Sequence, residues 1–181
     1  MTADISLIMF LGIVLMVATV TDLGFQKIPN ILTFPVMVTA LAYHGITNGL
    51  DGLLFSAAGL ALGIALLILP YLLGVMGAGD VKLMGAVGAI LGARGAFIAF
   101  LFSGIAGGIY ALMILLIRRK ECREFVTRYT TMLKTFVFTG CFIPIPAGRN
   151  EKTPRLFYGV AIASGTLFSV FLESLGYVFP I

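Results

Sequence analysis

The residues best suited to chemistry are two aspartates that lie at the edges of apolar runs. Asp80 lies in the sequence GAGDVKL (residues 77–83), and the chain on both sides of it is almost entirely apolar. Asp22 follows directly on the first apolar run, which starts at Ile5. An ionisable side chain in a membrane segment is energetically costly and therefore marks a functional site. The glycines before Asp80 let the backbone leave helical geometry and approach another segment closely.

Two carboxylates that share one site cannot easily both ionise, so one keeps its proton and the other becomes a base. Such a pair can take a proton from water and protonate the oxygen of a carbonyl under attack. This is the chemistry of aspartic proteases, and it needs no metal. The residue types leave open which aspartate is the base and whether the pair forms without substrate. His44 is the alternative base, but we expect it to be an interfacial residue near the opposite membrane face.

The composition indicates an all-α, polytopic membrane protein with a single domain over residues 1–181. Hydrophobic residues make up 60% of the chain and charged residues only 11%, compared with roughly 25% charged residues in soluble domains. The mean hydropathy is +1.09. Cys122 and Cys141 form no C-x-x-C pair, so we expect no zinc site and no cofactor.

The hydrophobic runs predict about six transmembrane helices, separated by turns rich in Gly, Pro and Asn. Asn30 is the predicted N-cap of the second helix. Gly59 and Gly63 give the third helix a face for close packing. We expect the short, glycine-rich fourth helix to be surrounded by its neighbours. The predicted spans are approximately 5–22, 30–46, 53–73, 81–91, 96–117 and 156–175.

Residues 118–140 predict an amphipathic helix on the membrane surface, because apolar side chains recur at helical spacing opposite basic ones. With six spans, eleven of the twelve lysines and arginines fall on one side of the membrane. The positive-inside rule makes that side cytoplasmic and places both termini outside. The predicted location is the inner (cytoplasmic) membrane, with Asp22 and Asp80 near its cytoplasmic face. This topology accounts for the basic pI, and we expect no nucleic-acid partner.

Three motifs carry a family resemblance. GAGDVK (residues 77–82) resembles the G-x-G-D-x-K signature of the type IV prepilin peptidases, a family of GxGD membrane aspartic proteases. Asp22 with the downstream Ile28-Pro29-Asn30 resembles the family's first aspartate motif, and residues 158–163 (YGVAIA) resemble its last-helix motif. The resemblance implies removal of short basic leader peptides from prepilin or pseudopilin precursors by Asp22 and Asp80. The residues it implies as motif and support are Gly77, Gly79, Lys82, Pro29, Asn30 and Gly159.

The sequence resembles the short, peptidase-only branch, such as the enzymes of tight-adherence (Flp) pilus systems. It lacks the N-terminal region with paired cysteines that is associated with N-methylation in long members. The alternatives are a small proton-coupled carrier and a non-catalytic pilus assembly factor. Asp80 could instead serve only as a helix cap. Lys82 either pairs with a carboxylate or anchors the chain at the membrane surface. Glu173 is expected near the outer surface, and the oligomeric state is open.

Overall fold

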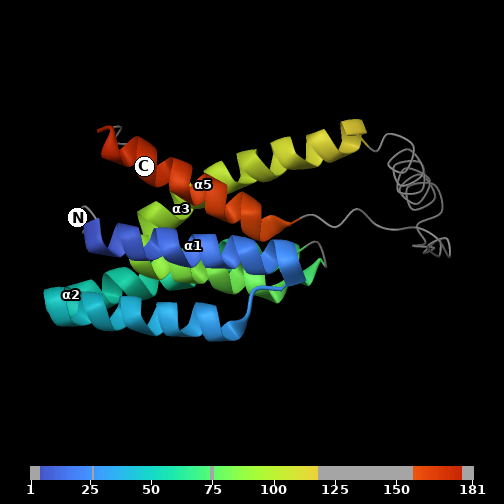
Figure 1. The fold of residues 1–181 in the computed structure, drawn as a ribbon. Coiled ribbons are helices and arrows are strands. Elements are labelled where there is room, and N and C mark those ends of the chain that lie inside the picture. The colour runs from blue at the N-terminus through green and yellow to red at the C-terminus, as the bar shows by residue number, and fades with distance from the viewer. Residues whose placement is uncertain (1–4, 26, 74–75, 118–156, 177–181) are drawn as a thin grey trace, which may run out of the picture. The chain divides into compact units, whose positions relative to one another are not determined.

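The computed structural model describes residues 5–25, 27–73, 76–117 and 157–176. Regular structure in these ranges is helical: α1 (Ile5–Phe25), α2 (Asn30–Leu72), α3 (Ala78–Ile117) and α5 (Tyr158–Ser174) (Figure 1). The chain divides into two compact units, Met1–Gly108 with Phe157–Ile181, and Ile109–Leu156. The features below belong to the first unit. The predicted amphipathic helix of residues 118–140 and both cysteines lie outside the described residues.

Helices α2 and α3 are each interrupted by one glycine. Gly49 has φ 62° and ψ −140°, and Gly92 has φ 74° and ψ 178°, so both leave the helical region. Only glycine adopts such positive φ values without strain. Each helix therefore consists of two halves, divided at or beside the turns that the sequence predicts. Within α2 the halves fold back on each other, and a Cβ at Gly45 would lie 3.7 Å from the Leu53 side chain (Figure 1).

The length and apolar character of the helices make this a membrane protein. Three described helices, α1, α2 and α3, are long and apolar enough to cross a membrane, and α5 is a shorter apolar helix. Along α1, large hydrophobic side chains are exposed at helical spacing: Met9, Ile13, Met16 and Val20. A continuous apolar face of this kind suits a helix that contacts lipid.

The first half of α3 is surrounded by its neighbours, as predicted. Leu83, Met84, Val87 and Ile90 are completely buried. The predicted small-residue face is confirmed as well, because Gly59 of α2 meets the backbone of Gly88 and Gly63 meets the backbone of Met84. Any Cβ at these glycines would overlap that backbone. Close packing thus holds the start of α3, which carries Asp80, in the middle of the unit.

His44 is buried rather than interfacial, which corrects the prediction from sequence. Its Nε2 lies 3.2 Å from the carbonyl oxygen of Ile90, and the Ser56 hydroxyl donates to the Ala89 carbonyl at 2.7 Å. Ala89 and Ile90 lie shortly before the break at Gly92. Buried side chains of α2 thus bond to backbone carbonyls of α3, a tertiary effect that hydropathy does not reveal.

Candidate active site

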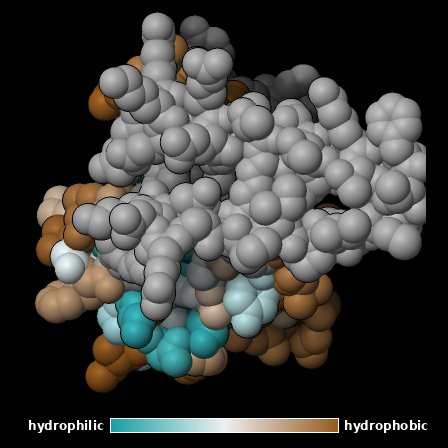
Figure 2. All heavy atoms as spheres, turned by 90° about the vertical axis from the view of Figure 1, so that its right-hand side faces the viewer, coloured by the Kyte–Doolittle hydropathy of each residue, from teal (hydrophilic) through white to brown (hydrophobic). Residues whose placement is uncertain are grey.

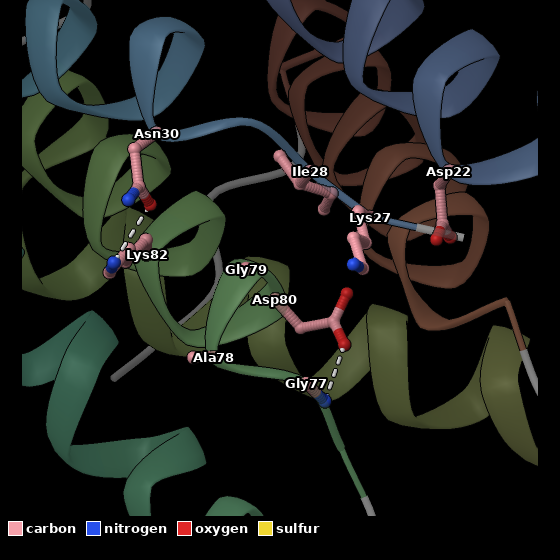
Figure 3. Close-up of a pocket in the computed structure, with 9 residues that line it drawn as sticks. All are labelled: Asp22, Lys27, Ile28, Asn30, Gly77, Ala78, Gly79, Asp80 and Lys82. Carbon is pink, nitrogen blue, oxygen red and sulfur yellow. Dashed lines mark hydrogen bonds between the residues drawn. The ribbon is translucent and has the colours of Figure 1, made fainter. Parts of the chain in front are cut away.

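A pocket of about 350 Å³ lies where the end of α1, the start of α2 and the start of α3 meet (Figure 3). Asp22 and Asp80 both line it, although they are far apart in sequence. Figure 2 views this end of the molecule and shows hydrophilic side chains gathered below the grey atoms, with hydrophobic ones on either side. The lining residues are Asp22, Lys27, Ile28, Asn30, Gly77, Ala78, Gly79, Asp80 and Lys82.

Asp22 lies in the last turn of α1 and is only 7% exposed. Its Oδ2 accepts a hydrogen bond from the backbone N–H of Gly159 at 3.0 Å. Gly159 is the second residue of α5, so the N-terminus of that helix is directed at the carboxylate and favours its negative charge. A Cβ at position 159 would lie 2.7 Å from the same oxygen, which explains the glycine.

Asp80 is the third residue of α3 and is 8% exposed. Its Oδ2 accepts a hydrogen bond from the backbone N–H of Gly77 at 3.0 Å, and its own N–H donates to the Gly77 carbonyl at 3.1 Å. A third-position acid that reaches back in this way is a capping arrangement. In Figure 3 the other carboxylate oxygen points into the pocket. Asp80 thus caps its helix and also lines the pocket, so the two interpretations are compatible.

Residues 77–82 pack against the connection between α1 and α2. A Cβ at Gly79 would lie 3.0 Å from the Cβ of Ile28 and 3.3 Å from its backbone N and O, so a larger residue would fit this approach only if Ile28 moved by a few tenths of an ångström. Three residues on, Lys82 Nζ donates to Asn30 Oδ1 at 2.8 Å and lies 5.0 Å from the centre of the Phe34 ring. These contacts hold the segment that carries Asp80 close to the segment that follows Asp22.

One prediction about this contact needs correction. The N-cap of α2 is Pro29, with φ −70° and ψ 141°, and no side chain caps it. Proline favours this extended backbone conformation, so Pro29 occupies the N-cap position without a side-chain hydrogen bond. The Asn30 amide oxygen instead accepts a hydrogen bond from Lys82. Among the described residues, the hydrogen-bond partner of Lys82 is thus an amide rather than a carboxylate, and its role as an anchor at the membrane surface stays a prediction.

The residues predicted from the motifs converge on this pocket. Six of them line it: Asp22, Asp80, Gly77, Gly79, Lys82 and Asn30. Pro29 immediately precedes Asn30, and Gly159 bonds to Asp22. The alternative base, His44, is not among the lining residues, and Glu173 is exposed near the end of α5. Sequence reasoning missed Lys27, which also lines the pocket but stands in the sequence only as one of the basic residues expected on the cytoplasmic side.

The arrangement is suited to acid–base chemistry. Two largely buried carboxylates line a pocket large enough for water and a peptide carbonyl, and each accepts a hydrogen bond from a backbone N–H group. Among the described residues, no group of three potential metal ligands was found. A carboxylate pair can supply both the base and the acid for attack of water on a carbonyl.

Comparison with known proteins gives two matches. A family model described as the type IV leader peptidase family matches residues 9–112. A protein of Bacillus subtilis (strain 168) named prepilin leader peptidase/N-methyltransferase is 32% identical over 120 residues, which cover 65% of this chain and 47% of that protein. The chain thus spans about half the length of this relative. No solved structure matches it.

Proposed function

Because the chain belongs to the type IV leader peptidase family, we propose that it is a membrane aspartic endopeptidase that removes the short basic leader from type IV pilin-like precursors. The substrate is a prepilin or pseudopilin, and Asp22 and Asp80 activate the attacking water. The observation that carries the proposal is that both aspartates line one pocket and each receives a backbone hydrogen bond.

In the proposed reaction, the ionised aspartate takes a proton from a water held between the two carboxylates. The water oxygen attacks the carbonyl carbon of the scissile peptide bond, while the protonated aspartate gives its proton to the carbonyl oxygen. The tetrahedral intermediate then collapses. The C–N bond breaks as the leaving amine takes up the proton first removed from water, and one hydroxyl of the intermediate returns its proton to the aspartate that acted as the acid. The pair returns to its starting state, with one proton shared by two carboxylates.

We also propose that the chain crosses the inner membrane six times, with the pocket near the cytoplasmic face. The length of α2 supports this proposal, because 43 residues in a straight helix would measure about 65 Å, roughly twice the thickness of the hydrocarbon core. The break at Gly49 lets each half cross separately, and the same reasoning applies to α3 at Gly92. The basic residues then set the orientation.

The test is to incubate the purified full chain, in detergent or liposomes, with a pilin precursor that carries its basic leader. A shortened product with a new N-terminus, formed in the presence of chelator, is the expected result. An intact precursor would favour the carrier or the assembly factor. Methylation is a separate outcome, because the name of the Bacillus subtilis relative also includes N-methyltransferase. Adding S-adenosylmethionine and measuring the mass of the product tests for it. We expect cleavage without methylation.

A further inference from the structure

Two lysines line the pocket as well as two aspartates, and within the described ranges one of the two ammonium groups is engaged. Lys82 donates to Asn30 and lies over Phe34. Lys27 is exposed and lines the same pocket, and its side chain forms no hydrogen bond or ion pair with another residue that the structure describes. Figure 3 shows its side chain directed into the pocket, with the ammonium toward the carboxylate oxygen of Asp80 that does not bond to Gly77.

A cation in this position changes how the two carboxylates share protons. Two carboxylates alone retain one proton at pH values where a single carboxylate would be ionised, because each negative charge disfavours the other. A nearby positive charge offsets that repulsion and favours the ionised form. Proposed catalysis needs one ionised and one protonated carboxylate, so the position of Lys27 sets the pH range in which this state exists.

We infer that Lys27 is the countercharge of the Asp22–Asp80 pair, a positioning residue that acts through the carboxylates. The inference rests on the proposed function. The location of Lys27 suits this role, because it lies in the short connection between Phe25 and Asn30 and brings its charge to the pocket mouth without occupying a helix. Two other titratable groups lie nearby: Lys82 of α3 lines the same pocket with its ammonium bonded to Asn30, and Tyr158 in the first turn of α5 interacts electrostatically with Asp80.

The experiment compares the pH profile of precursor cleavage by the wild-type chain and by Lys27→Met, which keeps the length of the side chain and removes its charge. Both limbs of the bell-shaped profile should move to higher pH, by roughly half to one pH unit for a solvated ammonium. The KM should change little. Lys27→Arg should keep the wild-type profile. Arg94→Gln removes a charge from an exposed position beside Gly92 and controls for net charge.

Salt gives a second readout. Because Lys27 is exposed, salt screens its charge, so raising the ionic strength should move the wild-type profile upward and move that of Lys27→Met less. An unshifted profile in Lys27→Met would overturn the inference, and so would a raised KM with an unchanged profile, which would make Lys27 a substrate contact. If the wild-type chain left the precursor intact, the proposed function would fail and this inference with it.

Discussion

At the scale of single residues, the site depends on backbone amides that hold the carboxylates. Asp22 accepts from Gly159, and Asp80 accepts from Gly77, in each case through Oδ2. Both aspartates are largely buried, so fixed donors replace the water that they lose. Gly159, with a further contribution from the Val160 backbone N–H, orients Asp22, and Gly77 orients Asp80, which leaves acceptor capacity on Asp80 for a water or substrate.

The first prediction concerns the aspartates. Asp22→Asn and Asp80→Asn should each lower precursor cleavage by on the order of 10,000-fold, because an amide can neither take a proton from water nor act as an acid. The two groups act in one step, so the double variant should be no worse than either single one. The measurement is the rate of product formation by equal amounts of membrane-inserted protein.

Asparagine keeps the size of aspartate and an oxygen that accepts the Gly77 or Gly159 amide, so folding should survive these changes. Thermal stability in detergent provides that control. If Asp80→Asn still cleaved the precursor substantially at normal expression, Asp80 would be only a helix cap. Asp22 and Asp80 would then not be the catalytic pair.

The second prediction concerns Gly159. In Gly159→Ala the new Cβ would lie 2.7 Å from Asp22 Oδ2, so the carboxylate must move and cleavage should fall by on the order of 100-fold. Gly104→Ala is the matched control, because a Cβ there meets nothing within 4 Å. A Gly159→Ala variant as active as Gly104→Ala would show that the position of Asp22 tolerates this displacement.

The sequence predicts these residues to different degrees. Asp22 and Asp80 stand out because a carboxylate beside an apolar run is costly. The need for glycine at position 159 is visible only when α5 is placed against Asp22. Lys27 could not be singled out, because a lysine between two apolar runs is equally well explained as a positive-inside residue. Three-dimensional contact, not residue type, distinguishes it.

At the scale of elements, helix bounds follow closely from the apolar runs. The second predicted span begins at Asn30, as α2 does, and the last one, 156–175, brackets α5 (Tyr158–Ser174). The role of Asn30 and the burial of His44 were predicted wrongly for one reason. Both depend on partners in another helix, Lys82 for Asn30 and Ile90 for His44, which local patterns do not contain.

The third prediction tests the contact between α2 and α3. Asn30→Ala and Lys82→Met should each lower kcat by on the order of tenfold, the effect of losing one hydrogen bond to a charged group, with little change in KM. Because both remove the same bond, the double variant should be no slower than either single one. Asn30→Asp gives Lys82 a carboxylate acceptor at the same position, so this variant should keep the wild-type kcat that Asn30→Ala loses.

Additive losses in the double variant would show that Asn30 and Lys82 act separately. Failure of Asn30→Asp to restore activity, with the protein folded, would show that the amide itself is needed. Either result would contradict a positioning role for this pair.

At the scale of the whole molecule, buried and exposed faces are arranged for a membrane. Residues 83–90 of α3 are buried, whereas α1 exposes a row of large hydrophobic side chains. The functional polar groups gather at one end of the helices, where Asp22, Asp80 and both lysines line one pocket. For the proposed function, such an arrangement would let a membrane-anchored precursor present a peptide bond just outside the hydrocarbon layer.

The last prediction tests the six crossings and their orientation. In a chain whose native Cys122 and Cys141 are replaced by serine, single cysteines at exposed Asp51 and Arg94, beside the breaks in α2 and α3, should react with a membrane-impermeant thiol reagent on intact cells. Cysteines at exposed Phe25 and Leu73, at the pocket end, should react only after permeabilisation. The native cysteines are predicted to be cytoplasmic and should likewise stay unlabelled on intact cells.

The choice of positions separates the alternatives. If α2 crossed the membrane once, Asp51 would lie within the hydrocarbon layer and remain unlabelled, whereas Leu73 would react from outside. If the orientation were inverted, Phe25 and Leu73 would both react on intact cells and Asp51 would not. That pattern would place Asp22 and Asp80 on the wrong side for a leader that stays in the cytoplasm. The same labelling experiment therefore tests the number of crossings and the access of the carboxylate pair to its proposed substrate.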